Sequence, residues 1–274
     1  MSERSERIED PRRAYDLTGR VAVITGAGSG IGRATSLALA AVGATVVCAD
    51  IAKEAAEATA ADIGDSGGTA TVAVVDTSDR ASVDDLVGGA VGAHGRLDIM
   101  GNIAGIMREA PVVDLTDEEL DLVLGINLKG VLYGCAAAGR VMVEQGSGSI
   151  VNMASGAIDT PAPKLAAYAI AKAGVAQLTR TFATEVARNG VRVNAVAPGF
   201  VMTGMTKRHW TDEAGNEDPA KRAQVEKGFG SFAPLGRVGD PMDIAHTVVF
   251  LASDASSFMT GQILRPNGGV AMPW

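Results

Sequence analysis

The chain has 274 residues, which is enough for one large domain or two small ones. Apolar residues make up 47% of it and charged residues 20%, a balance that excludes a disordered chain. The net charge of -8 and an aromatic content of only 4% argue against a surface that binds nucleic acid, so we expect no nucleic-acid partner.

The cysteines and the first residues indicate where the protein works. Cys48 and Cys135 both lie in apolar runs, where we expect buried, reduced thiols. The longest apolar run, 38–49, is shorter than a membrane span, and the first residues are charged and lack an apolar signal core. We therefore expect a cytoplasmic protein without a membrane partner. The three histidines show no ligand spacing, so we also expect no metal.

Short runs rich in Val and Ile alternate with helix-length segments along most of the chain. Residues 1–14 are polar, and we predict a flexible arm there, followed by one domain over 15–274. The predicted strands are 21–25, 45–50, 69–76, 97–100, 149–155, 191–198 and 262–266. The predicted helices include 30–42, 52–63, 116–145 and 165–188. Continuous apolar strands are typical of parallel sheets, so we predict a doubly wound α/β fold with helices on both faces.

One segment, 204–230, breaks the alternation. It is polar and follows a Pro-Gly turn at 198–199. This position favours a lid-like segment over an active site. A solvated surface insertion is the alternative.

A glycine-rich sequence, TGAGSGIG at 25–32, stands between the first strand and the first helix. Glycines at 26, 30 and 32 allow a tight turn and a close approach to a pyrophosphate, which the helix N-terminus attracts. Asp50 ends the second strand, where nucleotide-binding folds place the carboxylate that binds the adenosine ribose. Asp76 ends the third strand and is placed to reach the adenine. A helix cap is the alternative for both aspartates.

The strongest chemical signal is the pair Tyr168 and Lys172, which are four residues apart and so share one helix face. A phenol has a pKa near 10 and is a poor base at neutral pH, so we expect the ammonium group to lower the pKa of Tyr168. A chance surface pair is the alternative. Ser155, just past a strand, and Asn127 further upstream argue against it.

Taken together, residues 17–270 resemble a short-chain dehydrogenase/reductase. The resemblance rests on the glycine-rich sequence, NIAG at 102–105, Asn127, Ser155, the Tyr168/Lys172 pair and PGFVMT at 198–203. It implies a single-domain Rossmann fold with a seven-stranded parallel sheet. It also implies a homotetramer, and the many small residues on the helices at 120–145 and 165–188 favour such close packing.

The resemblance also assigns roles to site residues. It makes Tyr168 the acid/base, Ser155 the hydrogen-bond partner of the substrate oxygen, Lys172 the group that binds the nicotinamide ribose, and Asn127 the anchor of a proton-relaying water. The PGFVMT turn would hold the nicotinamide carboxamide. The full set of expected cofactor-binding residues is Gly26, Ser29, Gly30, Ile31, Gly32, Asp50, Ile51, Asp76, Thr77, Asn102, Ala104, Gly105, Tyr168, Lys172, Pro198, Gly199, Val201 and Thr203.

Two positions depart from the family pattern. Ile103 stands where the family often has a second asparagine, and Asn267 stands where it usually has an aspartate. We expect the fold at both turns to be intact.

The expected substrate is a mostly hydrophobic secondary alcohol or ketone. The predicted pocket wall comes from 156–165, from Met107 and nearby residues, and from the segment 204–230, and it has no cluster of Arg or Lys. It includes Ile158, Pro161, Pro163, Leu165, Met202, Met205 and Trp210. We expect NAD rather than NADP, because Asp50 would bind the ribose hydroxyls and repel a 2′-phosphate.

Two other functions remain open. One is an NADPH-dependent 3-oxoacyl-(acyl-carrier-protein) reductase, although such enzymes usually carry a basic residue near the ribose and none stands at Ser29 or Ile51. The other is a non-catalytic nucleotide-sensing module, which the presence of both Tyr168 and Lys172 disfavours.

Overall fold

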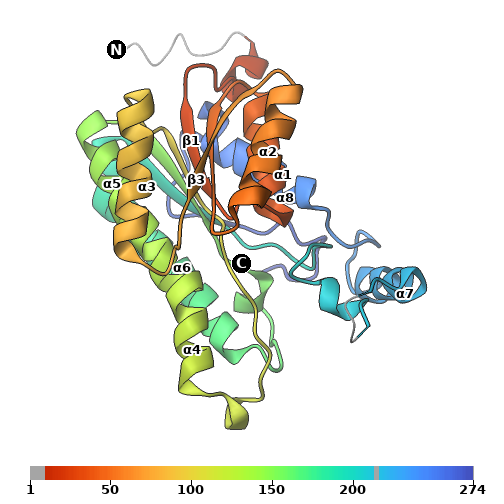
Figure 1. The fold of residues 1–274 in the computed structure, drawn as a ribbon. Helices are drawn as coiled ribbons and strands as arrows, with labels where there is room; N and C mark the ends of the chain where they lie inside the picture. The colour runs from red at the N-terminus through yellow and green to blue at the C-terminus, as the bar shows by residue number, and fades with distance from the viewer. Residues whose placement is uncertain (1–9, 213–215, 274) are drawn as a thin grey trace.

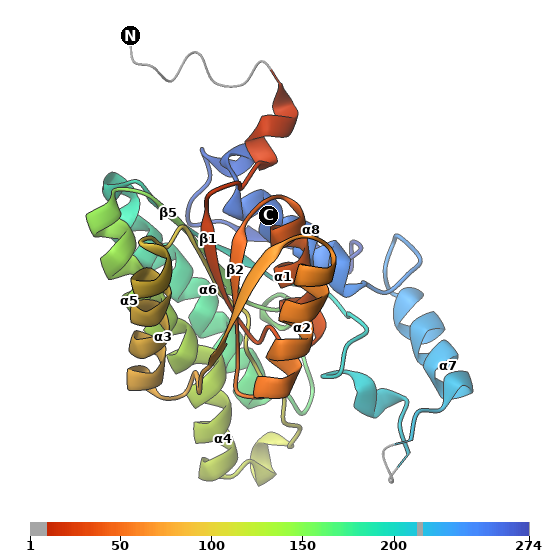
Figure 2. The same cartoon turned by 45° about the horizontal axis from the view of Figure 1, so that its top comes forward.

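A seven-stranded parallel sheet forms the centre of the molecule (Figures 1 and 2). The computed structural model describes residues 10–212 and 216–273. The sheet order is β3-β2-β1-β4-β5-β6-β7, and every pairing is parallel. The strands are β1 (Val21–Thr25), β2 (Thr45–Asp50), β3 (Thr69–Val74), β4 (Ile99–Asn102), β5 (Gly148–Met153), β6 (Val191–Val196) and β7 (Ile263–Leu264). This confirms the predicted single-domain, doubly wound α/β fold.

The strands follow the predicted pattern, with differences at the sheet edges and in the central strand β4, which begins and ends two residues later than predicted. All five residues of β1 are buried, as expected for a central strand. The outermost strand, β3, instead alternates between exposed and partly buried residues. The other edge strand, β7, has two residues rather than the predicted five, and it ends just before Arg265 and Pro266. Proline lacks an N–H and cannot extend the ladder.

Helices cover both faces of the sheet. On one face lie α1 (Gly30–Ala41), α2 (Lys53–Asp65) and α8 (Pro241–Ala252), and on the other lie α3 (Arg80–His94), α5 (Gly130–Gln145) and α6 (Ala166–Val186) (Figure 1). Neighbouring residues of β1 enter opposite cores: Val23 packs with the second group of helices and Ile24 with the first. Two further helices, α4 (Asp117–Leu124) and α7 (Pro219–Gly230), extend away from the layered part (Figures 1 and 2).

The helix predicted over 116–145 is interrupted. Thr116 caps its start by accepting a bond from the Glu119 N–H (3.2 Å), and a π-helical turn, Gly125–Lys129, separates α4 from α5. By length and composition alone, Asp117–Gln145 could cross a membrane, with a mean hydropathy of 1.4. Half of its most apolar 18-residue window is buried inside the protein. The sequence analysis missed it because polar residues interrupt its apolar runs.

The predicted arm, 1–14, lies mostly outside the described residues, which begin at Asp10. Pro11–Tyr15 form a 3₁₀ helix whose first turn is capped by the Asp10 side chain. Ala14 in this helix is buried. The folded part therefore begins before the predicted boundary at residue 15.

Candidate active site

A cavity of about 600 Å³ opens at the carboxyl edge of the sheet. The direction of winding reverses between β1 and β4, which is where parallel α/β sheets open a crevice. Each of the first six strands delivers lining residues from its carboxyl end: Gly26, Asp50, Asp76, Ala104, Ser155 and Pro198. The fold thus brings together segments that are far apart in the sequence.

Nearly all the residues singled out from the sequence line this one cavity. Of the predicted cofactor-binding residues, all but Asn102 line it, and so does the predicted catalytic residue Ser155. Asn102 and Asn127 are buried behind the wall. The other residues line the cavity, as a role in binding a cofactor or substrate requires. Their individual roles stay predictions.

The glycine-rich turn is held so tightly that two of its glycines have no room for a side chain. A Cβ on Gly26, which has a φ of +71°, would lie 2.9 Å from the backbone of Ala104. A Cβ on Gly32 would lie 1.9 Å from the Gly26 carbonyl oxygen. Helix α1 starts at Gly30, and its cap residue, Ser29, makes no side-chain capping bond. This end of the cavity therefore presents backbone and a helix N-terminus, which suits a pyrophosphate.

Asp50 organises the same end of the cavity. One carboxylate oxygen accepts a bond from the Gly28 N–H (2.9 Å) and the other from the Ala52 N–H (3.0 Å). A carboxylate offers about four lone-pair sites, so two remain for a ligand. Asp50 lines the cavity and also holds the glycine-rich turn, so the capping alternative and the ligand prediction are compatible.

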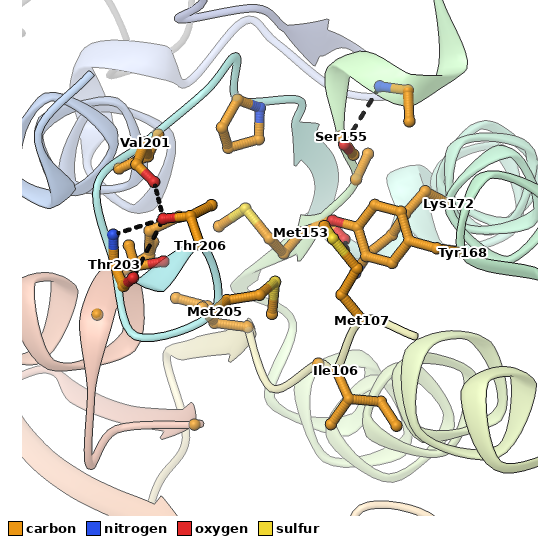
Figure 3. Close-up of a pocket in the computed structure, with 18 of the residues that line it drawn as sticks. Ile106, Met107, Met153, Ser155, Tyr168, Lys172, Val201, Thr203, Met205 and Thr206 are labelled. Atoms are coloured by element: carbon orange, nitrogen blue, oxygen red, sulfur yellow. Dashed lines mark hydrogen bonds between the residues drawn. The ribbon is translucent and has the colours of Figure 1, made fainter. Parts of the chain in front are cut away.

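Ser155, Tyr168 and Lys172 lie together at the other end of the cavity (Figure 3). Ser155 follows β5, and its hydroxyl accepts a bond from the Ala157 N–H (3.2 Å). Burial raises the pKa of Tyr168, while a hydrogen bond with Ser155 and the charge of Arg208 lower it. The contact between Ser155 and Tyr168 defines a point where a substrate oxygen can meet two hydroxyl groups.

The expected effect of Lys172 on Tyr168 is wrong for this structure. Its Nζ lies 5.6 Å from the centre of the Tyr168 ring, but the groups that lower the phenol pKa are Ser155 and Arg208. The reason is burial, which lowers the pKa of Lys172 to about 7 and so removes much of its charge near neutrality. Nζ donates one bond to the Met153 carbonyl (2.8 Å), which leaves donor capacity for a ligand.

Asn127 fastens a loop and does not line the cavity. It lies in the π-helical turn, where its Nδ2 donates to the carbonyls of Ile106 (2.9 Å) and Val123 (3.0 Å). Its Oδ1 accepts from the Ile106 N–H (3.2 Å). Asn102 likewise bonds inward, to Asn152 Oδ1 (2.9 Å). For both asparagines the structure shows positioning contacts behind the site.

Two threonines that the sequence analysis passed over shape the site. Thr25 Oγ1 accepts bonds from the N–H groups of Ile103 (3.0 Å) and Ala104 (3.2 Å), so the turn survives with isoleucine at 103. Thr206 Oγ1 donates to the Val201 carbonyl (2.8 Å) and accepts from the Thr203 N–H (2.9 Å), closing the loop after β6 (Figure 3). Thr25 bonds to residues far away in the sequence and Thr206 bonds within its own turn. No sequence motif indicates either contact.

The turn at Asn267 is also intact. Asn267 Oδ1 accepts from the Gly269 N–H (2.8 Å) and its Nδ2 donates to the Ala271 carbonyl (2.7 Å). Asn267 lines the cavity. The change from the expected aspartate therefore preserves the loop and alters only the charge there.

The wall around Tyr168 is apolar, though its members differ in part from those predicted. Met107, Leu165 and Met205 line the cavity as expected. Ile158, Pro161, Pro163, Met202 and Trp210 do not appear among the lining residues. Ile126, Phe200, Phe232 and Val270 also line the cavity and lie outside the predicted wall segments. Ile106 and Phe229 lie within those segments, although the prediction did not name them. Phe229 and Phe232 lie in or next to the segment 204–230, whose polar average hid them.

Comparisons with known proteins agree with this geometry. A family model described as enoyl-(acyl carrier protein) reductase matches residues 26–271, about nine-tenths of the chain. The 3-oxoacyl-[acyl-carrier-protein] reductase of Thermotoga maritima is 40% identical over 256 residues, covering 93% of this chain and 99% of that protein. The chain belongs to the short-chain dehydrogenase/reductase family.

Other members of the family differ in substrate. The D-threitol dehydrogenase of Mycolicibacterium smegmatis is 38% identical, covering 93% of this chain and 94% of that protein. A crystal structure of a gluconate 5-dehydrogenase from Burkholderia cenocepacia, in complex with NADP and tartrate, superposes with a TM-score of 0.86 at 32% identity. The superposition covers 94% of this chain and 98% of that one.

Membership in this family makes the chain an oxidoreductase that acts on CH–OH donors with a nicotinamide cofactor. The residues of the cavity fit such a group, because the glycine contacts leave a cradle without side chains and the Asp50 carboxylate lines the cavity beside it. The family does not by itself fix the substrate or the choice between NAD and NADP.

Proposed function

We propose that the protein is an NAD-preferring dehydrogenase or reductase of a mostly hydrophobic secondary alcohol or ketone. The observation that carries the proposal is the single cavity, in which the Ser155–Tyr168 contact faces an apolar wall while Asp50 and the glycine-rich turn line its far end. When bound, the nicotinamide would supply the hydride acceptor or donor.

In this proposal the protein's own groups handle the proton and hold the substrate. Tyr168 gives or takes the proton at the substrate oxygen, and Ser155 bonds the same oxygen. The free donors of Lys172 bind the nicotinamide ribose. Asn127, which fastens Ile106, keeps the loop beside them in place and, as a further part of the proposal, anchors a water that relays protons to Lys172.

The preference for NAD rests on charge at the adenosine end of the cavity. Asp50, Asp76 and Lys172 are the charged residues among those described that line it, and Lys172 belongs to the other end. The basic side chains on neighbouring helices have carboxylate partners: Arg33 pairs with Asp62 (2.5 Å) and Lys53 with Glu57 (3.3 Å). A 2′-phosphate would meet Asp50 without a free cation among the lining residues.

The expected preference is roughly 3–4 kcal/mol, or a few hundredfold, from one lost charge-assisted bond and a repulsion of similar size. Affinities of NADH and NADPH measured by fluorescence test it. Asp50→Asn keeps one oxygen acceptor but removes the charge, so it should narrow the gap. Asp65→Asn, the same chemical change at an exposed residue of α2 that does not line the cavity, is the matched control. Equal affinities of the two cofactors for the unmodified protein would refute the preference.

A second candidate is a 3-oxoacyl-(acyl-carrier-protein) reductase. The observation in its favour is the 40% identity to the Thermotoga maritima reductase. A screen of free secondary alcohols and ketones against a 3-oxoacyl thioester, each with NADH and NADPH, separates the two. Turnover of the thioester with NADPH alone would favour the second candidate.

We also propose self-association, with a homotetramer as the expected form. Leu122, Leu132 and Ile170 are exposed apolar residues on α4, α5 and α6, and these helices pack on one another. Of the small residues on α6 that suggested this surface, Ala167, Ala171 and Ala176 are buried within the chain itself, whereas Ala169 is partly buried and Ala173 is exposed. Exposed apolar side chains on packed helices are typical of subunit contacts.

A cytoplasmic location is part of the same proposal. Cys48 and Cys135 are both free and buried. Burial raises the pKa of Cys48 to about 11 and that of Cys135 to about 12, so neither forms a reactive thiolate. Such thiols suit a reducing compartment.

A further inference from the structure

An ion pair joins two segments 99 residues apart and contacts residues that line the cavity. Arg208 lies on a 3₁₀ helix, Lys207–His209, and Glu109 lies on the loop after β4. The Arg208 Nε donates to Glu109 Oε1 at 2.8 Å, and its Nη2 lies 2.6 Å from the same oxygen. Neither residue belongs to the family motifs quoted above.

The same guanidinium contacts two of the three methionines that line the cavity. Its Nη2 contacts Met107 Sδ at 3.0 Å, and its Nη1 donates to the Met205 carbonyl at 2.6 Å. Met107 and Met205 line the cavity, and Met107 packs in the apolar cluster that contains Tyr168 (Figure 3). Arg208 therefore holds the segment that begins at 204 against the loop that covers the phenol.

The loop that carries Glu109 is in turn tied to the helix that carries Tyr168. The Ala110 N–H donates to the Lys164 carbonyl (2.9 Å), and Ala110 pairs with Leu165, the residue before α6. The segment that begins at 204, the loop that carries Glu109 and the start of α6 are thus linked to one another. The Arg208–Glu109 pair is the ionic contact between the segment 204–210 and the loop 103–110.

The charges near Tyr168 indicate that the Arg208–Glu109 pair also affects the ionisation of the phenol. Lys172 faces the phenol from its own helix but is fully buried and titrates near neutrality. On the loop, Arg108 is exposed and its Nη1 bonds to the Met107 carbonyl (3.1 Å). Arg208 is the cation whose charge lowers the pKa of Tyr168. Glu109 lies against that cation and offsets part of its field.

The other charges around Arg208 come from its own segment. Lys207 is paired with Glu217 (3.1 Å), and Lys221 reaches the Thr211 carbonyl (3.4 Å). His209 has its pKa lowered by burial, then by Arg208, so it is uncharged at neutral pH. Glu109 is therefore the carboxylate that faces Arg208 from outside the segment.

We propose that Arg208 and Glu109 form a latch that closes the cavity wall over Tyr168, and that their opposite charges tune the proton transfer at that phenol in opposite directions. The role of Tyr168 in proton transfer rests on the proposed function. The effect of the two charges on the ionisation of Tyr168 does not. Exposed ion pairs hold their partners weakly, so the latch can open to admit a substrate.

Two substitutions break the same latch with opposite electrostatic consequences. Arg208→Gln removes the cation and should raise the pH at which Tyr168 ionises, while Glu109→Gln frees the cation and should lower it. A single charge that acts through a partly screened medium shifts such a titration by roughly half a pH unit. A structural loosening alone would move both variants the same way.

The first readout needs no substrate. The ultraviolet absorbance of tyrosinate is titrated in each variant, and the same titration of its Tyr168→Phe counterpart is subtracted, so that Tyr15 and Tyr133 cancel. Opposite shifts are expected. Shifts in the same direction, or none in either variant, would overturn the proposal. If the shifts are opposite while no alcohol is turned over, the proposed function fails and the electrostatic coupling stands.

The second readout separates the latch from the charge. Arg208→Lys keeps the cation but loses the fork that reaches Glu109, Met107 and Met205 together, so KM should rise about threefold or more with an unchanged tyrosinate titration. Lys207→Gln breaks a neighbouring pair of similar exposure and is the matched control, with KM and titration both unchanged. An unchanged KM in Arg208→Lys, Arg208→Gln and Glu109→Gln would overturn the latch.

Discussion

Lys172 shows how a single residue can cost stability in exchange for a function. It is 2% exposed, bonds one carbonyl and has a pKa of about 7, against 10.5 for the unburied group. Between those two pH values the unfolded chain binds the proton more readily than the folded one, so stability rises with pH across this range. At neutral pH the folded protein carries nearly the whole penalty of burying the amine.

We predict that Lys172→Met stabilises the protein near pH 7 while it abolishes turnover. Each pKa unit corresponds to about 1.4 kcal/mol, and the lost bond to Met153 offsets part of the gain, so the expected increase is roughly 2–4 kcal/mol. The gain should shrink as the pH approaches 10. Urea unfolding at pH 7 and pH 10 measures it. A variant less stable than the parent at pH 7 would show that the buried amine is not strained.

At the scale of single elements, α8 supports the cofactor end of the site indirectly. It packs against α1, the helix that begins in the glycine-rich turn. Its start is held by a capping box, in which Asp240 accepts from the Met242 N–H (2.8 Å) and Asp243 accepts from the Asp240 N–H (2.9 Å). Arg237 bonds to both oxygens of Asp243 and lowers its pKa to about 2.

We predict that Asp243→Asn lowers the free energy of unfolding by about 1 kcal/mol at pH 7, the usual effect of losing a cap. The folded pKa lies below the ordinary 3.8, so this contribution is present above about pH 4 and is lost as the pH falls toward 2. Unfolding by urea at pH 7 and pH 3 measures the change. Glu226→Gln, which removes an exposed pair with Arg222 on α7, is the control and should have almost no effect. An Asp243 effect that does not diminish at pH 3 would contradict the assignment.

At the scale of the whole molecule, the exposed apolar residues of α5 and α6 test the proposed assembly. We predict that the parent chain runs in solution at about four times its 27.9 kDa mass. Leu132→Glu with Ile170→Glu should reduce that mass, because two charges would be buried at each contact. Light scattering at micromolar concentration decides it. Phe258→Glu, at an exposed apolar residue outside α4, α5 and α6, is the control. A monomeric parent would rule out the homotetramer.

Local patterns in the sequence were enough for the strands and for most of the site. Strand ends, glycines and the Tyr168/Lys172 spacing are short-range features, and the parallel topology brings strand ends to one edge. What could not be predicted depends on contacts across the chain. Thr25 meets Ile103 and Ala104 only once β1 and β4 are paired. The direction in which the pKa of Tyr168 shifts depends on burial. The four-residue spacing between Tyr168 and Lys172 contains no information on burial.

The contacts of the side chains in the segment 204–230 could not be predicted for the same reason. Arg208 finds Glu109 over 99 residues, and Phe229 stacks on Phe200 with ring centres 3.8 Å apart. The segment was predicted to supply part of the pocket wall, and Met205 and Phe229 do line the cavity. Its polar sequence did not single out Phe229. Whether it opens and closes as a lid stays part of the latch proposal.

The central claim is that Tyr168 moves the proton in a nicotinamide-dependent oxidation of an alcohol. The most direct measurement is the rate at which a panel of hydrophobic secondary alcohols reduces NAD in the parent chain and in Tyr168→Phe, with NADH affinity measured on both. We predict turnover in the parent, a loss of at least about 100-fold in the variant and nearly unchanged NADH binding. Turnover retained in Tyr168→Phe would contradict the account.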